Sequence, residues 1–278
     1  MRRSPMSALL EAHDIAKRFG GLQALDGVSL SIGSGEIYGL IGPNGAGKTT
    51  FFNALTGLYP PDRGRFVFDG AALIPGSPQA AVARGIARTF QNIRLFRELS
   101  VLENVMAARH VHTRAGVWSV LAGSPASRAE EQACAERARA LLDYVGIGRL
   151  AGSLAQQLSY GDQRRLEIAR ALATEPRLLA LDEPAAGMNA TETGALRELI
   201  ERIRAGGITV LLIEHDVKLV MGLCDRVAVL DFGRKIAEDT PAVVQRDPRV
   251  VEAYLGGSPH GHLSGAGAPA ADPQHAGR

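Results

Sequence analysis

The sequence of 278 residues has few of the features that mark membrane-spanning or secreted proteins. Its only cysteines, Cys134 and Cys224, are too few and too far apart for a disulfide framework or a metal site, so reduced thiols are expected. No apolar run approaches the roughly 18 to 20 residues of a membrane helix, and the arginine-containing start is followed by too short an apolar stretch for a signal peptide. We therefore expect a soluble, cytoplasmic chain that forms no membrane path itself.

The sequence also has no large excess of charge of either sign. Lys+Arg 31 against Asp+Glu 29 leaves a formal net charge of +2. A dedicated nucleic-acid binder normally carries a strong basic excess, so no nucleic-acid partner is expected. Hydrophobic residues make up 46% of the chain, which is typical of a globular protein with a substantial core.

The first 70 residues favour β-structure. Segments 8–14, 25–32, 36–41 and 64–69 are apolar or alternate between apolar and polar residues, with glycines between them. A helix is expected to begin in the glycine-rich stretch after residue 41 and to end at Gly57. This order predicts a β-rich start to an α/β fold.

Helical and buried-strand patterns follow. Residues 92–155 are rich in alanine, glutamate and arginine and are expected to form a mostly helical subdomain. Segments 178–184 and 208–215 are short apolar runs typical of buried parallel strands, with an amphipathic helix between them. A hairpin turn is expected at Phe232–Gly233, followed by two short helices. The glycine-, alanine- and proline-rich tail, residues 256–278, is predicted to be disordered.

Residues 42–49 match the phosphate-loop pattern G-x-x-x-x-G-K-[ST], between an expected strand and an expected helix. Glycines allow successive main-chain N–H groups to face the phosphates, Lys48 supplies a positive charge, and Thr49 offers its hydroxyl to Mg²⁺. The pattern predicts a nucleoside triphosphate site formed by Gly42, Pro43, Asn44, Gly45, Ala46, Gly47, Lys48, Thr49 and Thr50.

Two adjacent carboxylates, Asp182 and Glu183, end the apolar run that begins at residue 178. Side chains alternate along a strand, so the two carboxylates diverge and can serve different purposes. Asp182 is predicted to support the metal and Glu183 to polarise the attacking water as general base.

A third segment, LSYGDQ at residues 158–163, precedes a helical pattern in which Ser159 is an expected N-cap. By itself this is only a capped helix. Together with the phosphate loop and the carboxylate pair, it resembles the signature of the ATP-binding cassette (ABC) family over residues 8–255. The resemblance implies a P-loop NTPase core of the ABC ATPase type, with an N-terminal antiparallel β-subdomain and a helical subdomain inserted at about 92–155.

The resemblance implies further roles, with ATP and Mg²⁺ as cofactors. Gln91 matches the glutamine that touches metal and water, which makes Thr49, Gln91 and Asp182 the expected metal-binding residues. His215 matches a histidine that contacts the γ-phosphate, although a histidine after a buried strand is ordinarily structural. Phe19 matches an aromatic residue that stacks on adenine, and a core or surface phenylalanine is its ordinary alternative. Ser159, Tyr160 and Gly161 would contact the ATP bound to a second cassette. The commonest family pattern has Gly at Tyr160, Gln at Asp162 and Asp at Asn189.

Several longer segments, including TFQNIRLFRELSVLENV, DEPAAGMN and VVEAYLGG, resemble the ATPase of branched-chain (hydrophobic) amino acid importers. This implies a second ABC ATPase subunit (in a homo- or heterodimer), two transmembrane permease subunits and, indirectly, a separate solute-binding protein. It also implies a peripheral position on the cytoplasmic face of the inner membrane, with residues 92–106 contacting a permease helix.

Other ABC proteins remain alternatives. A related system for urea or amide import or for lipid or lipopolysaccharide export would have the same cassette motifs. A soluble ABC protein would commonly carry two cassettes or a long coiled-coil insertion, and neither pattern is present. A P-loop kinase or GTPase would not explain residues 158–163 together with Glu183 and His215.

Overall fold

The computed structural model describes residues 8–91, 93–109 and 125–255. Its N-terminal part is an antiparallel four-stranded sheet of order β2-β1-β4-β5. The strands are β1 (Ala8–Phe19), β2 (Leu22–Gly33), β4 (Arg63–Phe68) and β5 (Ala71–Ala72). Strands β1 and β2 are longer than predicted because register shifts along their pairing interrupt the alternation of apolar and polar residues.

A second, mostly parallel sheet of order β10-β9-β3-β8-β7-β6 forms the centre of the protein. Only β10 runs antiparallel to its neighbour. The strands are β3 (Ile37–Ile41), β6 (Ile86–Arg88), β7 (Leu178–Asp182), β8 (Thr209–Ile213), β9 (Arg226–Asp231) and β10 (Arg234–Asp239). Every residue of β3, β7 and β8 is buried, as continuous apolar runs predict for parallel strands covered on both faces.

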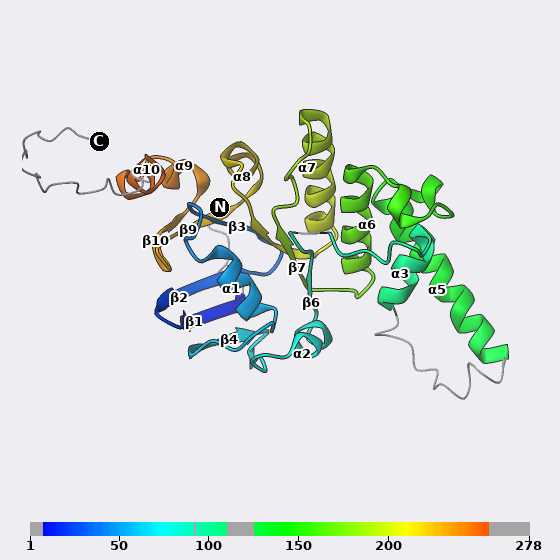
Figure 1. Cartoon of the computed structure of the whole chain (residues 1–278), viewed down its shortest axis with the longest axis horizontal. Coiled ribbons are helices and arrows are strands. Elements are labelled where there is room, and N and C mark those ends of the chain that lie inside the picture. Colours follow the sequence, from blue (N-terminus) through cyan, green and yellow to red (C-terminus); the bar gives the residue numbers. More distant parts are fainter. Residues whose placement is uncertain (1–7, 92, 110–124, 256–278) are drawn as a thin grey trace, which may run out of the picture.

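Helices cover the central sheet (Figure 1). They are α1 (Lys48–Leu55), α2 (Pro78–Ala83), α6 (Tyr160–Leu172), α7 (Ala190–Ala205), α8 (Val217–Leu223), α9 (Pro241–Val244) and α10 (Pro248–Leu255), with short 3-10 helices at Gly148–Leu150 and Ala155–Gln157. The apolar stripe predicted between the two buried strands is the buried face of α7. Segments α2, β5, β6 and α8 are too short to give a periodic signal and were not predicted.

The helices expected between residues 92 and 155 are present as α3 (Val101–Arg109) and α5 (Pro125–Tyr144). With α6 they lie at the end of the protein away from β1 and β2 (Figure 1). The tail predicted to be disordered, residues 256–278, lies outside the described residues.

Alternate residues of the central strands contribute to two separate apolar cores. Leu178 and Ala180 of β7 face the core that contains α1 and the antiparallel sheet. Leu179 and Leu181 of the same strand face the core that contains α6 and α7. The phosphate-loop helix and the helix after residue 159 therefore pack on opposite faces of one sheet.

Phe232 occupies an unfavourable position in the predicted turn between β9 and β10. Phe232 and Gly233 have φ angles of 41° and 77°, so both are left-handed. A two-residue hairpin of this kind favours asparagine followed by glycine. The ring of Phe232 is 86% exposed, so it contributes little packing.

We expect Phe232→Asn to raise the free energy of unfolding by about 1 kcal/mol, because asparagine adopts left-handed φ more readily than phenylalanine. Urea unfolding of the full chain measures the change. Phe232→Ala is the matched control, since it removes the ring but keeps the unfavourable conformation. Equal stabilisation by both substitutions would attribute the gain to loss of the ring instead.

Candidate active site

The phosphate loop connects β3 to α1 and depends on two glycines. Gly42 has a φ of 149°, and a Cβ there would lie 2.1 Å from the carbonyl oxygen of Leu230. Gly47 has a φ of 100°, and its Cβ would lie 2.5 Å from the carbonyl oxygen of Ala24. No other residue fits either position without moving the backbone.

Lys48 folds back over this loop from the first turn of α1. Its Nζ donates hydrogen bonds to the carbonyl oxygens of Gly42, at 2.7 Å, and Pro43, at 2.9 Å. Burial lowers the pKa of Lys48, while the carboxylates of Glu183 and Asp182 act in the opposite direction. The ammonium group is therefore held at the loop, where a phosphate would meet it. Thr49, the next residue, is exposed and Thr50 is half-buried.

Asp182 is the last residue of β7 and Glu183 follows outside the strand, so the alternation that predicted their divergence does not extend to Glu183. Asp182 is 2% exposed, and burial raises its pKa from 3.8 to about 6, opposed mainly by Arg88. Its main-chain N–H donates to the hydroxyl of Thr89 at 3.3 Å. Glu183 adopts a left-handed φ of 47°, and its N–H donates to the carbonyl of Ile213 at 2.9 Å. Backbone conformations of this type often occur at functional sites.

Glu183 contacts two of the other predicted residues. The side-chain amide of Gln91 donates to its Oε2 at 3.0 Å. Nδ1 of His215 lies 3.8 Å from the same oxygen. Gln91 and His215 lie beyond the carboxyl ends of β6 and β8, which flank β7 in the sheet. The structure thus brings Gln91, Glu183 and His215 together around a carboxylate that can accept a proton.

Glu214 joins these loops and was missed by sequence reasoning. Its side chain is fully buried and accepts main-chain hydrogen bonds from Ala185, at 2.8 Å, and His215, at 3.2 Å. Burial raises the pKa of Glu214, and these hydrogen bonds oppose the shift. It fixes the loop after Glu183 to the loop that carries His215. A glutamate directly after an apolar strand and before a histidine was the available signal.

Phe19 lies beside α1 at the end of β1 and is 45% exposed. Its ring meets that of Tyr59 edge-on, with centroids 5.4 Å apart, and the hydroxyl of Tyr59 donates to the carbonyl of Thr50 at 3.2 Å. Nζ of Lys17 lies 5.5 Å from both ring centroids. Phe19 is thus linked to the phosphate-loop helix through Tyr59, which sequence reasoning did not identify.

Ser159, Tyr160 and Gly161 lie at the beginning of α6, away from the phosphate-loop helix. Ser159 is the N-cap of α6, as predicted, and its Oγ accepts from the N–H of Asp162 at 3.2 Å. Helices α6 and α1 are separated in Figure 1. The ring of Tyr160 is 44% exposed. Asn189 caps α7 in a reciprocal arrangement with Glu192, so its change from the common aspartate preserves a helix cap.

The fold and the site define a P-loop nucleotide hydrolase. A sequence profile of the ABC transporter family matches residues 25–186, and a profile of branched-chain amino acid ATP-binding cassette transporters matches residues 234–260. The chain belongs to the ABC transporter family and is an ATPase of the ABC type. Among the described residues, no helix is long and apolar enough to cross a membrane.

Individual relatives agree with this assignment. The high-affinity branched-chain amino acid transport ATP-binding protein LivG of Salmonella typhimurium is 48% identical over 250 residues, which cover 89% of this chain and 98% of LivG. The lipopolysaccharide export system ATP-binding protein LptB of Escherichia coli is 36% identical over 249 residues, covering 90% and 98%. The ADP conformation of an ATP-binding cassette of an ABC transporter superposes with a TM-score of 0.78 at 32% identity, covering 90% of this chain and 100% of that one.

If Glu183 is the general base, Glu183→Gln should lower ATP turnover by about 10²-fold or more, because a neutral amide cannot accept the proton. ATP binding should persist, since Lys48 and the phosphate loop are unchanged. Turnover and nucleotide affinity are measured on the same preparation. Glu198→Gln, on the exposed face of α7, is the matched control. Unchanged turnover in Glu183→Gln would reject Glu183 as the base.

Burial of Asp182 also predicts a pH dependence of stability. Between about pH 4 and about pH 6 the folded chain binds more proton at Asp182 than the unfolded chain, so the free energy of unfolding falls as pH rises through this window. Asp182→Asn should lack this part of the decrease. Urea unfolding without nucleotide or Mg²⁺, at several pH values in the window, compares the two chains. Parallel pH profiles would contradict the assignment to Asp182.

Proposed function

We propose that this chain is the ATP-binding and ATP-hydrolysing subunit of an importer for branched-chain or related amino acids. The observation that carries the enzymatic part is the position of Glu183, between Gln91 and His215 at the edge of the phosphate loop. The import part is supported by the match of residues 234–260 and by the high identity to LivG.

Different groups of the site bind the nucleotide and promote its hydrolysis. The main-chain N–H groups of residues 42–48 and the ammonium of Lys48 hold the phosphates, and Phe19 stacks on the adenine. His215 contacts the γ-phosphate. Glu183 accepts a proton from the attacking water, and Gln91 orients both the water and the carboxylate.

The site suits Mg²⁺ delivered with the nucleotide. The described residues contain no cluster of three His, Cys, Asp or Glu side chains that would form a metal site from protein groups alone. Mg²⁺ prefers oxygen ligands and is usually held by one or two carboxylates together with substrate phosphates. Asp182, the hydroxyl of Thr49 and the amide oxygen of Gln91 would hold it, and when bound it neutralises phosphate charge.

ABC ATPase subunits of transporters work as dimers with membrane permeases. In the proposed dimer, Ser159 and Gly161 at the N-terminus of α6 contact the γ-phosphate in the partner's phosphate loop. ATP then joins the two subunits, and hydrolysis removes that bridge. The separation of α6 from α1 within one chain is consistent with this arrangement, because Ser159 has no role at its own phosphate loop.

The proposed permease contact is a cavity of 630 Å³ beside residues 93–96. Leu95 and Phe96 line it together with three cationic side chains, Arg88, Arg94 and Arg170. Phe96 is half exposed, and the guanidinium of Arg170 lies 4.9 Å from its ring centroid, so the lining combines apolar and cationic groups. Val101, which sequence reasoning also considered for this surface, is fully buried in the helical core and is not part of the lining.

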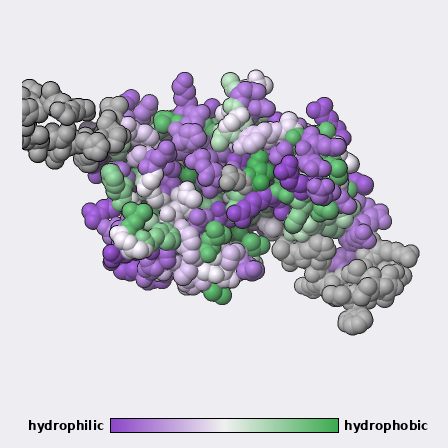
Figure 2. Space-filling model, in the orientation of Figure 1, coloured by the Kyte–Doolittle hydropathy of each residue, from purple (hydrophilic) through white to green (hydrophobic). Residues whose placement is uncertain are grey.

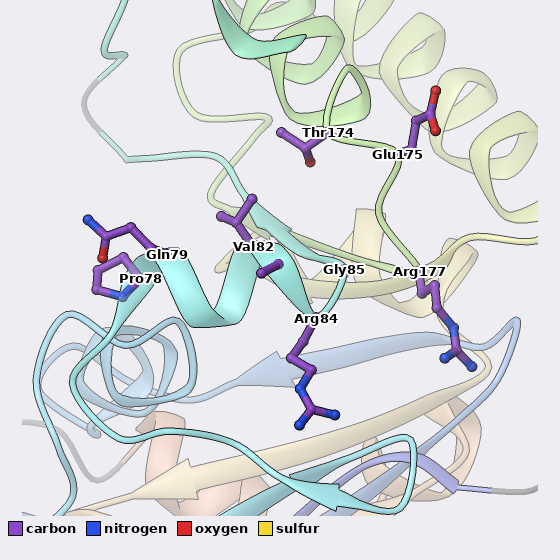
Figure 3. A pocket seen from close by; sticks show the side chains of 9 residues that line it. Pro78, Gln79, Val82, Arg84, Gly85, Thr174, Glu175 and Arg177 are labelled. Carbon is purple, nitrogen blue, oxygen red and sulfur yellow. The ribbon is translucent and has the colours of Figure 1, made fainter. Parts of the chain in front are cut away.

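A second cavity of 630 Å³ lies on the other side of α2 (Figure 3). Pro78, Val82 and Thr174 line both cavities, so α2 separates two parts of one hollowed surface. Elsewhere on the face shown in Figure 2, hydrophilic residues predominate and apolar ones form small groups. As the ATPase subunit of an importer, the chain would lie peripherally on the cytoplasmic face of the membrane, attached through its permeases.

An ABC ATPase for lipopolysaccharide export is the second candidate, supported by the match to LptB. That match is 36% identical over 249 residues, against 48% over 250 residues for LivG. The match at residues 234–260 also favours the amino acid system.

Recovery of the complex tests the proposal. We expect Glu183→Gln, purified from its native membrane with ATP, to retain two multi-span permeases and a second cassette. Lys48→Ala is the matched control, because it should weaken ATP binding and so reduce recovery of the second cassette. Permeases encoded beside an amino acid binding protein would support import. Recovery of lipopolysaccharide-export permeases, or of no membrane protein, would reject it.

A further inference from the structure

A buried ion pair on α6 is not explained by the roles assigned above. The side chains of Arg164 and Glu167 are 1% and 5% exposed, and Nη1 of Arg164 lies 2.9 Å from Oε2 of Glu167. Charged side chains are almost never this deeply buried unless they are paired. Both residues also form hydrogen bonds outside the pair.

These outer hydrogen bonds hold the main chain at residues 90 and 91. The N–H of Phe90 donates to Oε1 of Glu167 at 2.9 Å. Arg164 donates from Nη1 to the carbonyl of Phe90 at 2.5 Å and from Nη2 to the carbonyl of Gln91 at 2.7 Å. Helix α6 therefore holds, by three hydrogen bonds, the main chain of the segment that carries the side chain of Gln91 to Glu183.

Tyr160 connects the same arginine to the beginning of α6. Its hydroxyl accepts a hydrogen bond from Nη2 of Arg164 at 3.3 Å, and the guanidinium lies 5.7 Å from the ring centroid. On its other side the ring lies 3.4 Å from the position that a Cβ would take at Gly187, in the loop between Glu183 and α7. A glycine at position 160, the commonest residue in the family pattern, would make neither contact.

We propose that Tyr160, Arg164 and Glu167 form a connection through which contact at the N-terminus of α6 sets the position of Gln91. The inference rests on the proposed dimer, in which the N-terminus of α6 contacts the partner's ATP. Tyr160 and Arg164 are then positioning residues for hydrolysis in their own subunit. Each ATP thereby influences the geometry of the other site, and the influence is reciprocal.

The physical basis is the rigidity of a buried ion pair in which both terminal nitrogens of Arg164 and both oxygens of Glu167 are hydrogen-bonded, while Nε of Arg164 has no partner. If α6 shifts while residues 90–91 stay in place, a charged group or a carbonyl loses its partner in a dry environment, which is unfavourable. The two segments are therefore expected to move together. The side chain of Gln91 meets the base through a 3.0 Å hydrogen bond to Glu183, so a small displacement of its main chain changes that contact.

Two substitutions test the connection in the full-length chain, within the recovered complex. Arg164→Lys keeps the charge opposite Glu167 but cannot span both carbonyls, and Tyr160→Phe removes only the hydroxyl at a half-exposed site. We expect kcat to fall about 10-fold in Arg164→Lys and about 3-fold in Tyr160→Phe, and the ATP affinity of Arg164→Lys, measured in the Glu183→Gln background, to stay unchanged. The Hill coefficient for ATP should fall toward one in both variants.

A double-mutant cycle with Gln91→Ala identifies the route of the effect. If Arg164 acts through Gln91, Arg164→Lys should lower kcat no further in the Gln91→Ala background. An equal fold-loss with and without Gln91, or unchanged kcat and cooperativity in both single variants, would overturn the proposal. Tyr144→Phe is the matched control, since Tyr144 has a similar arginine contact, with Arg202 at 5.2 Å, remote from the site.

Failure of this inference can be distinguished from failure of the proposed function. If no permease is recovered but the chain hydrolyses ATP, the importer assignment fails while the cycle is still measured on the full-length chain. If the unsubstituted chain and its complex do not hydrolyse ATP, the proposed function itself fails. If urea unfolding shows that Arg164→Lys does not fold, Tyr160→Phe still tests the proposal, because its exposed site tolerates the change.

Discussion

The confinement of the phosphate loop between two strands is the constraint on which the rest of the site depends. Carbonyl oxygens of Leu230 in β9 and Ala24 in β2 approach the loop so closely that only glycine fits opposite them. The turn after β9 adds a further link, because the N–H of Gly233 donates to the carbonyl of Ala46 at 3.0 Å. Both sheets therefore fix the loop before any ligand binds. Preorganised main-chain donors of this kind are effective because they need no rearrangement when charge arrives.

The order of the central strands then brings together the side chains proposed to be catalytic. Gln91, Glu183 and His215 follow β6, β7 and β8, which are adjacent in the sheet, so residues far apart in sequence meet at its carboxyl edge. That Glu183 and His215 follow buried strands could be predicted because β7 and β8 are continuous apolar runs, although the role of His215 was implied by the family resemblance. Strand β6 has only three residues and no such signal, so the position of Gln91 depended on family resemblance.

The sequence did not reveal which charged side chains contact one another in the folded protein. The pairing of Arg164 with Glu167 has the i, i+3 spacing of an ordinary exposed pair, and only the tertiary fold buries it. In the same way, the sequence shows Glu214 only as a carboxylate next to a histidine. The main-chain groups that donate hydrogen bonds to it become evident only in the folded structure. The lengths of β1 and β2 were underestimated for a related reason, since bulges are set by pairing between strands and not by local pattern.

The buried carboxylates near the phosphate loop differ in how their charge is stabilised. Glu214 accepts hydrogen bonds from rigid main-chain N–H groups, and Glu167 accepts one from Phe90 beside its arginine partner. These donors belong to the protein and not to the nucleotide, so both residues suit a structural role. Asp182 depends chiefly on the charge of Arg88, and its pKa remains near 6. An additional cation would favour its ionised form. Asp182 is thus the carboxylate whose charge responds most directly to what the nucleotide brings into the site.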